Sequence, residues 1–322
     1  MTQLLVLREH ILKFYQKFAL FLNPLFRFVI GFITFSSINQ IIGYHPVLNK
    51  TSVEVLLALL SILMPGSVLL FAAAVFVVVH IFYVSNMLAL VIMVILFIIY
   101  FAYIKFVPAH AYAIVAVPIA FSLNLVYGIP ILLGLFMTPA AIVPITCGVG
   151  IYYLLQAVTS VVSTSADTSM NLYHALQQQF FDCKEMYAMM FVFSLVSLLV
   201  YIMRTREWDY SFDIAILAGA VCNTILLLII KYLLDMNLDM FSFFSGIILS
   251  TVLVWIAQFM HLALNYASVE HLQFEDEEYY YYVRAVPKMN VAAPSKRVKR
   301  INVRHFSEQM QGMDSGKERD KE

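Results

Sequence analysis

The sequence predicts an all-α polytopic integral membrane protein with about eight transmembrane helices, some broken by Pro or Gly, and a short extended C-terminal cytoplasmic segment. Three observations predict this class: 62% of the 322 residues are hydrophobic, only 12% are charged, and the charges gather at the chain ends and at short connections between apolar runs. Soluble domains average about 45–50% apolar and about 25% charged residues. So little polar surface could not cover a soluble enzyme of this length, which excludes that class.

Residues 1–24 are expected to form an amphipathic helix that lies in the membrane interface. Apolar side chains recur there at helical spacing, and basic side chains such as Arg8 fall elsewhere. Pro24 would permit a turn into the first span, residues 25–43. Arg27 begins that span, where it either snorkels to the headgroups or acts as a functional buried charge.

The transmembrane bundle is predicted to cover residues 25–264. The apolar stretch 53–85 exceeds the roughly 20 residues that cross a bilayer, and it is broken at 64–67 (MPGS), so a half-helix should precede a full crossing. The polar segment 164–186 is expected to lie outside. The eight expected crossings are 25–43, 67–85, 87–107, 110–127, 129–161, 187–203, 213–234 and 241–264.

Eight crossings place both termini on one side, and the distribution of basic residues selects the cytoplasmic side. With cytoplasmic termini, sixteen Lys and Arg residues lie inside, ten of them in the tail at 265–322. The outer side then keeps only four, namely Lys50, Lys105, Lys184 and Lys231. The sequence therefore predicts a multi-pass protein of the cell membrane with both termini cytoplasmic.

Two apolar segments resemble each other at an offset of 65 residues. Residues 60–71 (LSILMPGSVLLF) align with 125–136 (LVYGIPILLGLF), which places Pro65 opposite Pro130. Either this is a repeat of the kind from which transporters build a midplane site, or apolar segments align by chance because few residue types dominate them. Under the first interpretation, a permease pathway would involve Pro65, Asn124, Pro130 and Asn223.

Small residues recur every fourth position in the last two spans. Such stripes let helix backbones approach closely, and an Asn can add an interhelical hydrogen bond. They indicate helix packing inside the bundle or contact with a separate membrane partner. The stripes comprise Ala215, Gly219 and Asn223 in one span and Ser242, Gly246 and Ser250 in the other.

The sequence predicts no catalytic residue, no metal site and no cofactor, and we expect no enzyme. The eight histidines and three cysteines are scattered singly, without metal-ligand or disulfide spacing. No zinc-protease motif or phosphate-binding loop is present in the sequence. Ionisable residues are nearly absent from the middle of the expected spans, which argues against an ion-driven pump but permits a neutral or lipid-like solute.

The tail contains the most distinctive text, VEHLQFEDEEYYYYVRAVPKMNV at 269–291, with four carboxylates before four tyrosines. The segment 281–286 has the composition of a strand, and an isolated strand needs a partner for its backbone. That partner could be a second copy or another protein; alternatively, the tyrosines form an interfacial belt. The predicted partner-binding residues are Phe274, Tyr279, Tyr280, Tyr281, Tyr282, Val283, Arg284, Val286 and Pro287.

A basic cluster follows at 294–300 (PSKRVKR) and is expected to attract the anionic lipid bilayer. One short cluster without a fold around it does not indicate nucleic-acid binding, so no nucleic-acid partner is expected.

The stretch FEDEEYYYYVRAVPK, the MPGS break and the connection EWDYSFDIAI resemble an uncharacterised family of multi-pass membrane proteins from anaerobic Gram-positive bacteria. The resemblance covers nearly the whole chain and implies a bacterial cytoplasmic membrane, but no activity. The leading hypothesis is therefore a non-enzymatic scaffold or complex subunit that docks a protein partner, or self-associates, through its tail and last two helices. The alternative is a permease for a neutral or lipid-like solute.

Overall fold

The computed structural model describes residues 2–164, 169–206, 210–234, 239–266, 270–275 and 280–285, and they are almost entirely helical. The chain divides into two compact units, the first ending at residue 265 and the second beginning at residue 266. The longer helices are α1 (Thr2–Ile42), α2 (Thr51–Ser61), α3 (Gly66–Phe82), α4 (Asn86–Ile99), α5 (Ala111–Ser122), α6 (Ile129–Phe136), α7 (Ile142–Thr164), α8 (Ser169–Phe181), α9 (Lys184–Arg204), α10 (Ser211–Leu234) and α11 (Met240–Tyr266).

Six of the described helical segments are long and apolar enough to cross a membrane, which confirms the predicted multi-pass membrane class. The expected crossings at 67–85 and 110–127 are instead shorter apolar helices, Gly66–Phe82 and Pro108–Ser122, because breaks in the chain cut them. The six long segments are Lys13–Ile42, Asn86–Ile104, Pro139–Thr164, Lys184–Arg204, Ser211–Leu234 and Met240–Met260.

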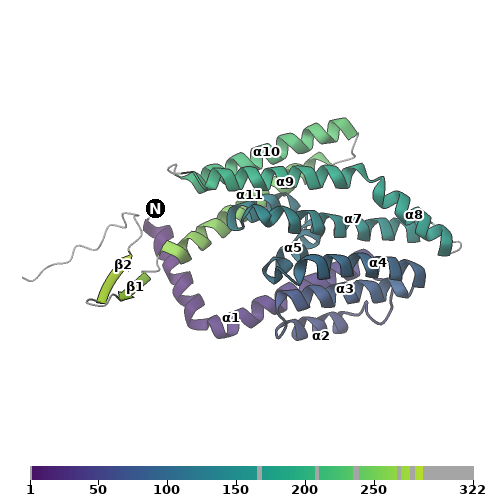
Figure 1. Cartoon of the computed structure of the whole chain (residues 1–322), viewed down its shortest axis with the longest axis horizontal. Coiled ribbons are helices and arrows are strands. Elements are labelled where there is room, and N and C mark those ends of the chain that lie inside the picture. Colours follow the sequence, from purple (N-terminus) through teal and green to yellow (C-terminus); the bar gives the residue numbers. More distant parts are fainter. Residues whose placement is uncertain are drawn as a thin grey trace, which may run out of the picture. The chain divides into compact units, whose positions relative to one another are not determined.

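Prolines set the ends of several short elements but not of α1. α1 continues through Pro24 without a break, and Figure 1 shows that this helix is bent along its length, so the change of direction occurs within one helix and not between two. A proline inside a helix removes one backbone hydrogen bond, and the rest of this 41-residue helix outweighs that loss. Pro130 lies in the first turn of α6, and Pro139 opens the 3₁₀ turn η4 (Pro139–Ala141) ahead of α7. The expected crossing at 129–161 is therefore two helices.

Apolar side chains of the first unit form two large cores that share α7. One core joins α1, α3 and α4 to the C-terminal half of α7 and to α8. The other joins α5, α6 and the N-terminal half of α7 to α9, α10 and α11. Figure 1 shows α9 beside α10 on one side, α3 beside α4 on the other, and α7 between them. We call the helices around the first of these cores the N-terminal bundle and the helices around the second the C-terminal bundle.

The second unit contains an antiparallel hairpin of β1 (Glu270–Glu275) and β2 (Tyr280–Ala285). Glu270 pairs with Ala285 at one end of the ladder and Glu275 pairs with Tyr280 at the other. One edge of the tyrosine-rich strand therefore has its partner within the same chain, a possibility that the sequence analysis did not consider. Of the predicted partner-binding residues, Tyr279, Val286 and Pro287 lie outside the described residues.

Candidate functional site

The first helix break, residues 62–65, lies on the surface of the N-terminal bundle. Turns within the chain provide hydrogen bonds for some of its backbone groups, since Ile62 N donates to Leu59 O (3.3 Å) and Leu63 N donates to Leu60 O (3.1 Å). Arg27 of α1 donates to Ile62 O across 3.3 Å. The Leu63 side chain is 83% exposed, and Pro65 is also exposed. Exposed Arg27 therefore supports a helix end instead of acting as a buried charge within the bundle.

The second helix break, residues 123–128, is exposed at Leu123 and Asn124 and buried at 126–128, and residues of α10 and α11 contact it. Asn124 adopts a left-handed backbone (φ 55°), which an Asn tolerates better than most residues. Its side-chain nitrogen donates to Ser242 O of α11 (2.9 Å), and Asn223 Nδ2 of α10 donates to Tyr127 O (3.1 Å). Since Asn223 is fully buried, this bond holds the broken backbone inside protein.

The far end of α6 is held by Arg204, the last residue of α9. Its guanidinium donates to Leu135 O and to Met137 O, the latter across 2.9 Å. A helix end leaves carbonyl groups without intrahelical donors, and a planar guanidinium can serve two of them at once. Arg204 therefore performs at α6 the role that Arg27 performs at α2, a function that the sequence analysis missed.

The predicted stripe on α10 packs against the second break. Ala215, Gly219 and Asn223 are buried. A methyl group placed on Gly219 would lie 2.5 Å from Val200 Cγ2 of α9 and 3.4 Å from Ile131 Cγ1 of α6. The absence of a side chain therefore lets α10 approach both helices closely.

The predicted stripe on α11 meets the same segment from another direction. A methyl group on Gly246 would lie 2.8 Å from Asn124 O. Buried Ser250 lies beside Gly128, whose added methyl group would be 3.1 Å from Ser250 Cβ. Ser242 is exposed and contributes its carbonyl to Asn124. The stripe residues thus pack on α6, on α9 and on the second break.

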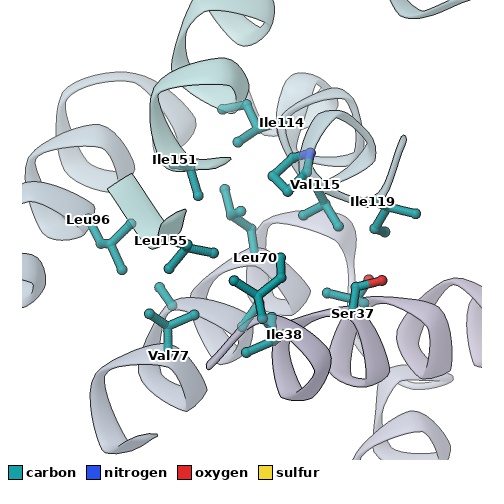
Figure 2. A pocket seen from close by; sticks show the side chains of 15 residues that line it. Ser37, Ile38, Leu70, Val77, Leu96, Ile114, Val115, Ile119, Ile151 and Leu155 are labelled. Atoms are coloured by element: carbon teal, nitrogen blue, oxygen red, sulfur yellow. The ribbon is translucent and has the colours of Figure 1, made fainter. Parts of the chain in front are cut away.

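A narrow apolar cavity lies among five helices at the centre of the first unit (Figure 2). Its volume is about 60 Å³, which suits a slender apolar group. Small side chains, such as Ala73 and Ala74 of α3, help to leave this space. The lining residues are Thr34, Ser37, Ile38 and Ile41 of α1; Leu70, Ala73, Ala74 and Val77 of α3; Leu96 of α4; Ile114, Val115, Pro118 and Ile119 of α5; and Ile151 and Leu155 of α7.

A wider cavity of about 260 Å³ shares Ile151 of α7 with the narrow one. It is lined by Ile95 and Ile99 of α4, Thr146, Cys147, Gly150, Ile151 and Leu154 of α7, Phe180 of α8 and Met190 of α9. Pro65, Asn124, Pro130 and Asn223, the predicted pathway residues, line neither of these two cavities.

The few polar groups in the two linings are largely engaged with their own helices. Thr34 Oγ1 donates to Ile30 O (2.7 Å), and Thr146 Oγ1 donates to Val143 O (3.0 Å). Among the described residues that line the two cavities, none is charged. Placing an ion there would cost several kcal/mol, about 2.5–3.5 on insertion scales, so the linings favour an uncharged, apolar ligand.

A separate polar cluster joins α1, α2 and α3 near the turn at 43–50. Asn39 Nδ2 donates to Glu54 Oε1 (2.7 Å) and to Leu48 O (3.1 Å), and His45 N donates to His80 Nδ1 (3.2 Å). Asn39, Glu54 and His80 are all buried. In the described ranges, no group of three His, Cys, Asp or Glu side chains could hold a metal ion. The printed bonds of this cluster connect the three helices and their turn.

The described helices thus define a multi-pass membrane protein with two uncharged cavities among its helices. Comparison of the chain with known protein families, with curated proteins and with solved structures found no match. The cavities and their chemistry are therefore the basis for assigning a function.

Proposed function

We propose that the protein is a non-enzymatic permease that binds a neutral, lipid-like compound between its two bundles. The observation that carries this proposal is the pair of uncharged cavities that are lined in part by α4 and α7 and share Ile151. Apolar cavities inside proteins stay dry and take up apolar molecules. A compound already dissolved in the bilayer would reach such a site without crossing water.

Photolabelling in proteoliposomes tests this proposal. The probe is a long-chain alcohol that carries a photoreactive diazirine near its methyl end. We expect labelling of peptides from α1, α3, α5 and α7 that unlabelled alcohol competes away, because a defined site saturates and the lipid-facing surface does not. Failure to find any saturable labelling would refute the proposal.

A matched pair of variants on α3 localises the labelling. Ala74 lines the narrow cavity, and its neighbour Val75 is 42% exposed on the outer face. Ala74→Phe should remove most of the saturable labelling, because the ring occupies the cavity. Val75→Phe adds a ring on the same turn and should leave the labelling unchanged. Equal losses in both variants would contradict a site in the cavity.

We also propose the finer topology: eight crossings in a bacterial cytoplasmic membrane, with both termini cytoplasmic. The shorter helices α3 and η2–α5 (η2, Pro108–His110) would then complete the six long ones. Single cysteines at Lys50, Lys184 and Arg206, in a chain whose native cysteines are replaced by serine, test this with an impermeant maleimide applied to intact cells. We expect labelling at the first two positions and protection at the third.

A second candidate function is the scaffold that docks a partner, or a second copy, through the tail and the last two helices. The hairpin favours it, because a two-stranded sheet in its own unit is only marginally stable in water without something packed on it. Light scattering of purified full chain, of a version ending at Ser268 and of a version with Tyr279–Tyr282 changed to Ser tests self-association. A larger assembly for the full chain alone is expected; equal masses would refute self-association.

A further inference from the structure

Ile151 of α7 lies between the two cavities, because it is the residue that lines both of them. One turn further along α7, and on α4, consecutive residues line different cavities. Leu155 lines the narrow cavity and Leu154 the wide one, and on α4 Leu96 lines the narrow cavity while Ile95 lines the wide one. Figure 2 shows Ile151 and Leu155 on the narrow-cavity side, across from Leu70.

The residue that the two linings share is a partly exposed side chain. Ile151 packs against the α1–α3–α4 core and also against a small core of α3, η1 (Tyr100–Ile104) and α5 residues. Its side chain is only partly buried, although its neighbours Leu154 and Leu155 are buried. A β-branched side chain in a helix keeps its χ1 rotamer, but its terminal methyl group can turn about χ2 into space on either side without displacing the helix.

The flexible side chain of Met190 lines the wide cavity. A methyl group placed on Gly150 would lie 3.1 Å from Met190 Cε, the end of an unbranched side chain. Met side chains adapt to irregular space more easily than branched ones. Each lining holds two polar side chains, Thr34 and Ser37 in the narrow cavity and Thr146 and Cys147 in the wide one, and the larger volume of the wide cavity, about 260 Å³ against about 60 Å³, leaves room for the bulkier polar end of an amphiphile.

We propose that the two cavities are the ends of one tunnel for an uncharged, single-chain amphiphile, and that Ile151 controls passage between them. The polar end lies in the wide cavity, and the chain passes Ile151 so that its methyl end reaches the narrow cavity among Ile38, Leu70 and Ile114. This inference rests on the proposed function and names its substrate class. The absence of charge from both linings selects an alcohol or ester over an ionised acid or a phosphate.

The tail diazirine of the long-chain alcohol tests the tunnel, because its label reports where the methyl end lies. In the unmodified chain we expect saturable labels on α1 or α5 residues of the narrow cavity. Ile151→Trp should reduce those labels about tenfold, the effect of losing burial for about two methylene groups, and move them to α8 or α9 residues of the wide cavity. Ile151→Ala should keep or increase the labels in the narrow cavity.

Val143→Trp is the matched control, since Val143 lies on α7 with 39% exposure and lines neither cavity. It should leave the label positions unchanged, and thermal stability in detergent should show that each variant folds. Labels confined to the wide cavity of the unmodified chain, or unmoved by Ile151→Trp, would overturn the tunnel while leaving the binding proposal intact. No saturable label anywhere would overturn the binding proposal itself.

A separate labelling experiment tests whether the cavities prefer an uncharged compound. A long-chain fatty acid with the same diazirine, at a pH where its carboxyl group is ionised, should label the cavities at least about tenfold less than the alcohol, since about 1.4 kcal/mol of desolvation already gives that ratio. Equal labelling by the acid and the alcohol would overturn the uncharged substrate class.

Discussion

The two helix breaks look alike in sequence but are packed differently, since residues 126–128 of the second break are buried. The first, at 62–65, is exposed, and α2 packs mainly on α1. The second, at 123–128, continues into α6, which lies against α9 and is contacted by residues of α10 and α11. An arginine donates to a carbonyl at the end of the short helix beside each break: Arg27 at the end of α2, where the first break begins, and Arg204 at the far end of α6, beyond the second break.

A break at proline and glycine residues does not by itself mark a transport pathway. Irregular backbone at membrane depth needs donors and acceptors from protein, and each break receives them by packing. The cavities lie elsewhere, beside regular parts of α4 and α7. The second break therefore acts as a fixed joint, and its cost in stability should exceed that of the first when either is disturbed.

The largest difference in the free energy of unfolding is expected for two glycines, one where α6 contacts α9 and one where α1 contacts α2. A methyl group on Gly134 of α6 would lie 2.5 Å from the backbone Ser197 O of α9, whereas one on Gly31 of α1 would meet the side chain of Ser61 at 2.1 Å. Gly134→Val should cost about 3 kcal/mol and Gly31→Val about 1 kcal/mol, because α2 can move outward and α9 cannot. Unfolding by SDS in mixed micelles measures both values.

Gly150→Ala provides the control for the glycine series, because its added methyl group would meet the flexible end of Met190. It should change the free energy of unfolding by less than about 0.5 kcal/mol. If Gly31→Val were as costly as Gly134→Val, the two breaks would be equally constrained and the comparison would fail.

The next largest difference in the free energy of unfolding is expected between variants of Arg204 and Arg27. Arg204→Leu should cost about 2–3 kcal/mol, since charged hydrogen bonds to two carbonyls are lost, and Arg27→Leu less than about 1 kcal/mol, since one long bond on the surface is lost. Arg204→Lys keeps the charge but not the planar fork, so it should recover only part of the loss. Full recovery in the lysine variant would show that charge alone matters at α6.

Hydropathy and charge placement were enough to predict the membrane class and most of the long helices, because burial in lipid demands long apolar segments. They failed where proline position was ambiguous. Pro24 is tolerated inside α1, while the residues around Pro139 divide one expected crossing into α6 and α7. The local sequence does not distinguish these cases, because packing against neighbouring helices decides between them.

The cavities could not be predicted, because nothing about Ile151 or Ala74 differs from other apolar residues in the sequence. A cavity depends on which side chains fail to meet, and that is a property of three-dimensional packing. The small-residue stripes and the two asparagines did stand out, yet their partners were not predictable. Asn124 and Asn223 bond to the backbone at Ser242 and Tyr127, far away along the chain.

A smaller effect is expected at Asn223. Asn223→Leu has nearly the same size but leaves Tyr127 O without this donor, so unfolding should become easier by about 1 kcal/mol, within the range measured for such bonds in membranes. Thr224→Val is the control, because Thr224 Oγ1 donates only to Ala220 O of its own helix (2.7 Å). A loss in the control as large as at Asn223 would remove the special role of the second break.

The smallest effect concerns pH at the start of α11, the helix whose Ser242 accepts the bond from Asn124. Hydrogen bonds from the Ser242 side chain and backbone, and from Phe241 N, hold the pKa of Asp239 below its ordinary value. A lowered pKa means that the ionised carboxylate favours the folded state. That contribution is present above the unfolded pKa of about 3.9 and is lost as the pH falls through the folded value.

Thermal midpoints in detergent between about pH 6 and pH 3, around the ordinary aspartate pKa, should therefore fall slightly more for the unmodified chain than for Asp239→Asn, whose amide oxygen still accepts the backbone bonds at every pH. Asp239 caps the start of α11 by accepting these bonds. When Asn124→Ala is added to both the unmodified chain and Asp239→Asn, the difference between their falls in thermal midpoint should stay unchanged if Asp239 stabilises α11 alone. The difference should increase if Asp239 also helps to hold α11 against the second break. Because the bond from Asn124 ends at Ser242 O, in the same turn that Asp239 caps, we expect the larger difference.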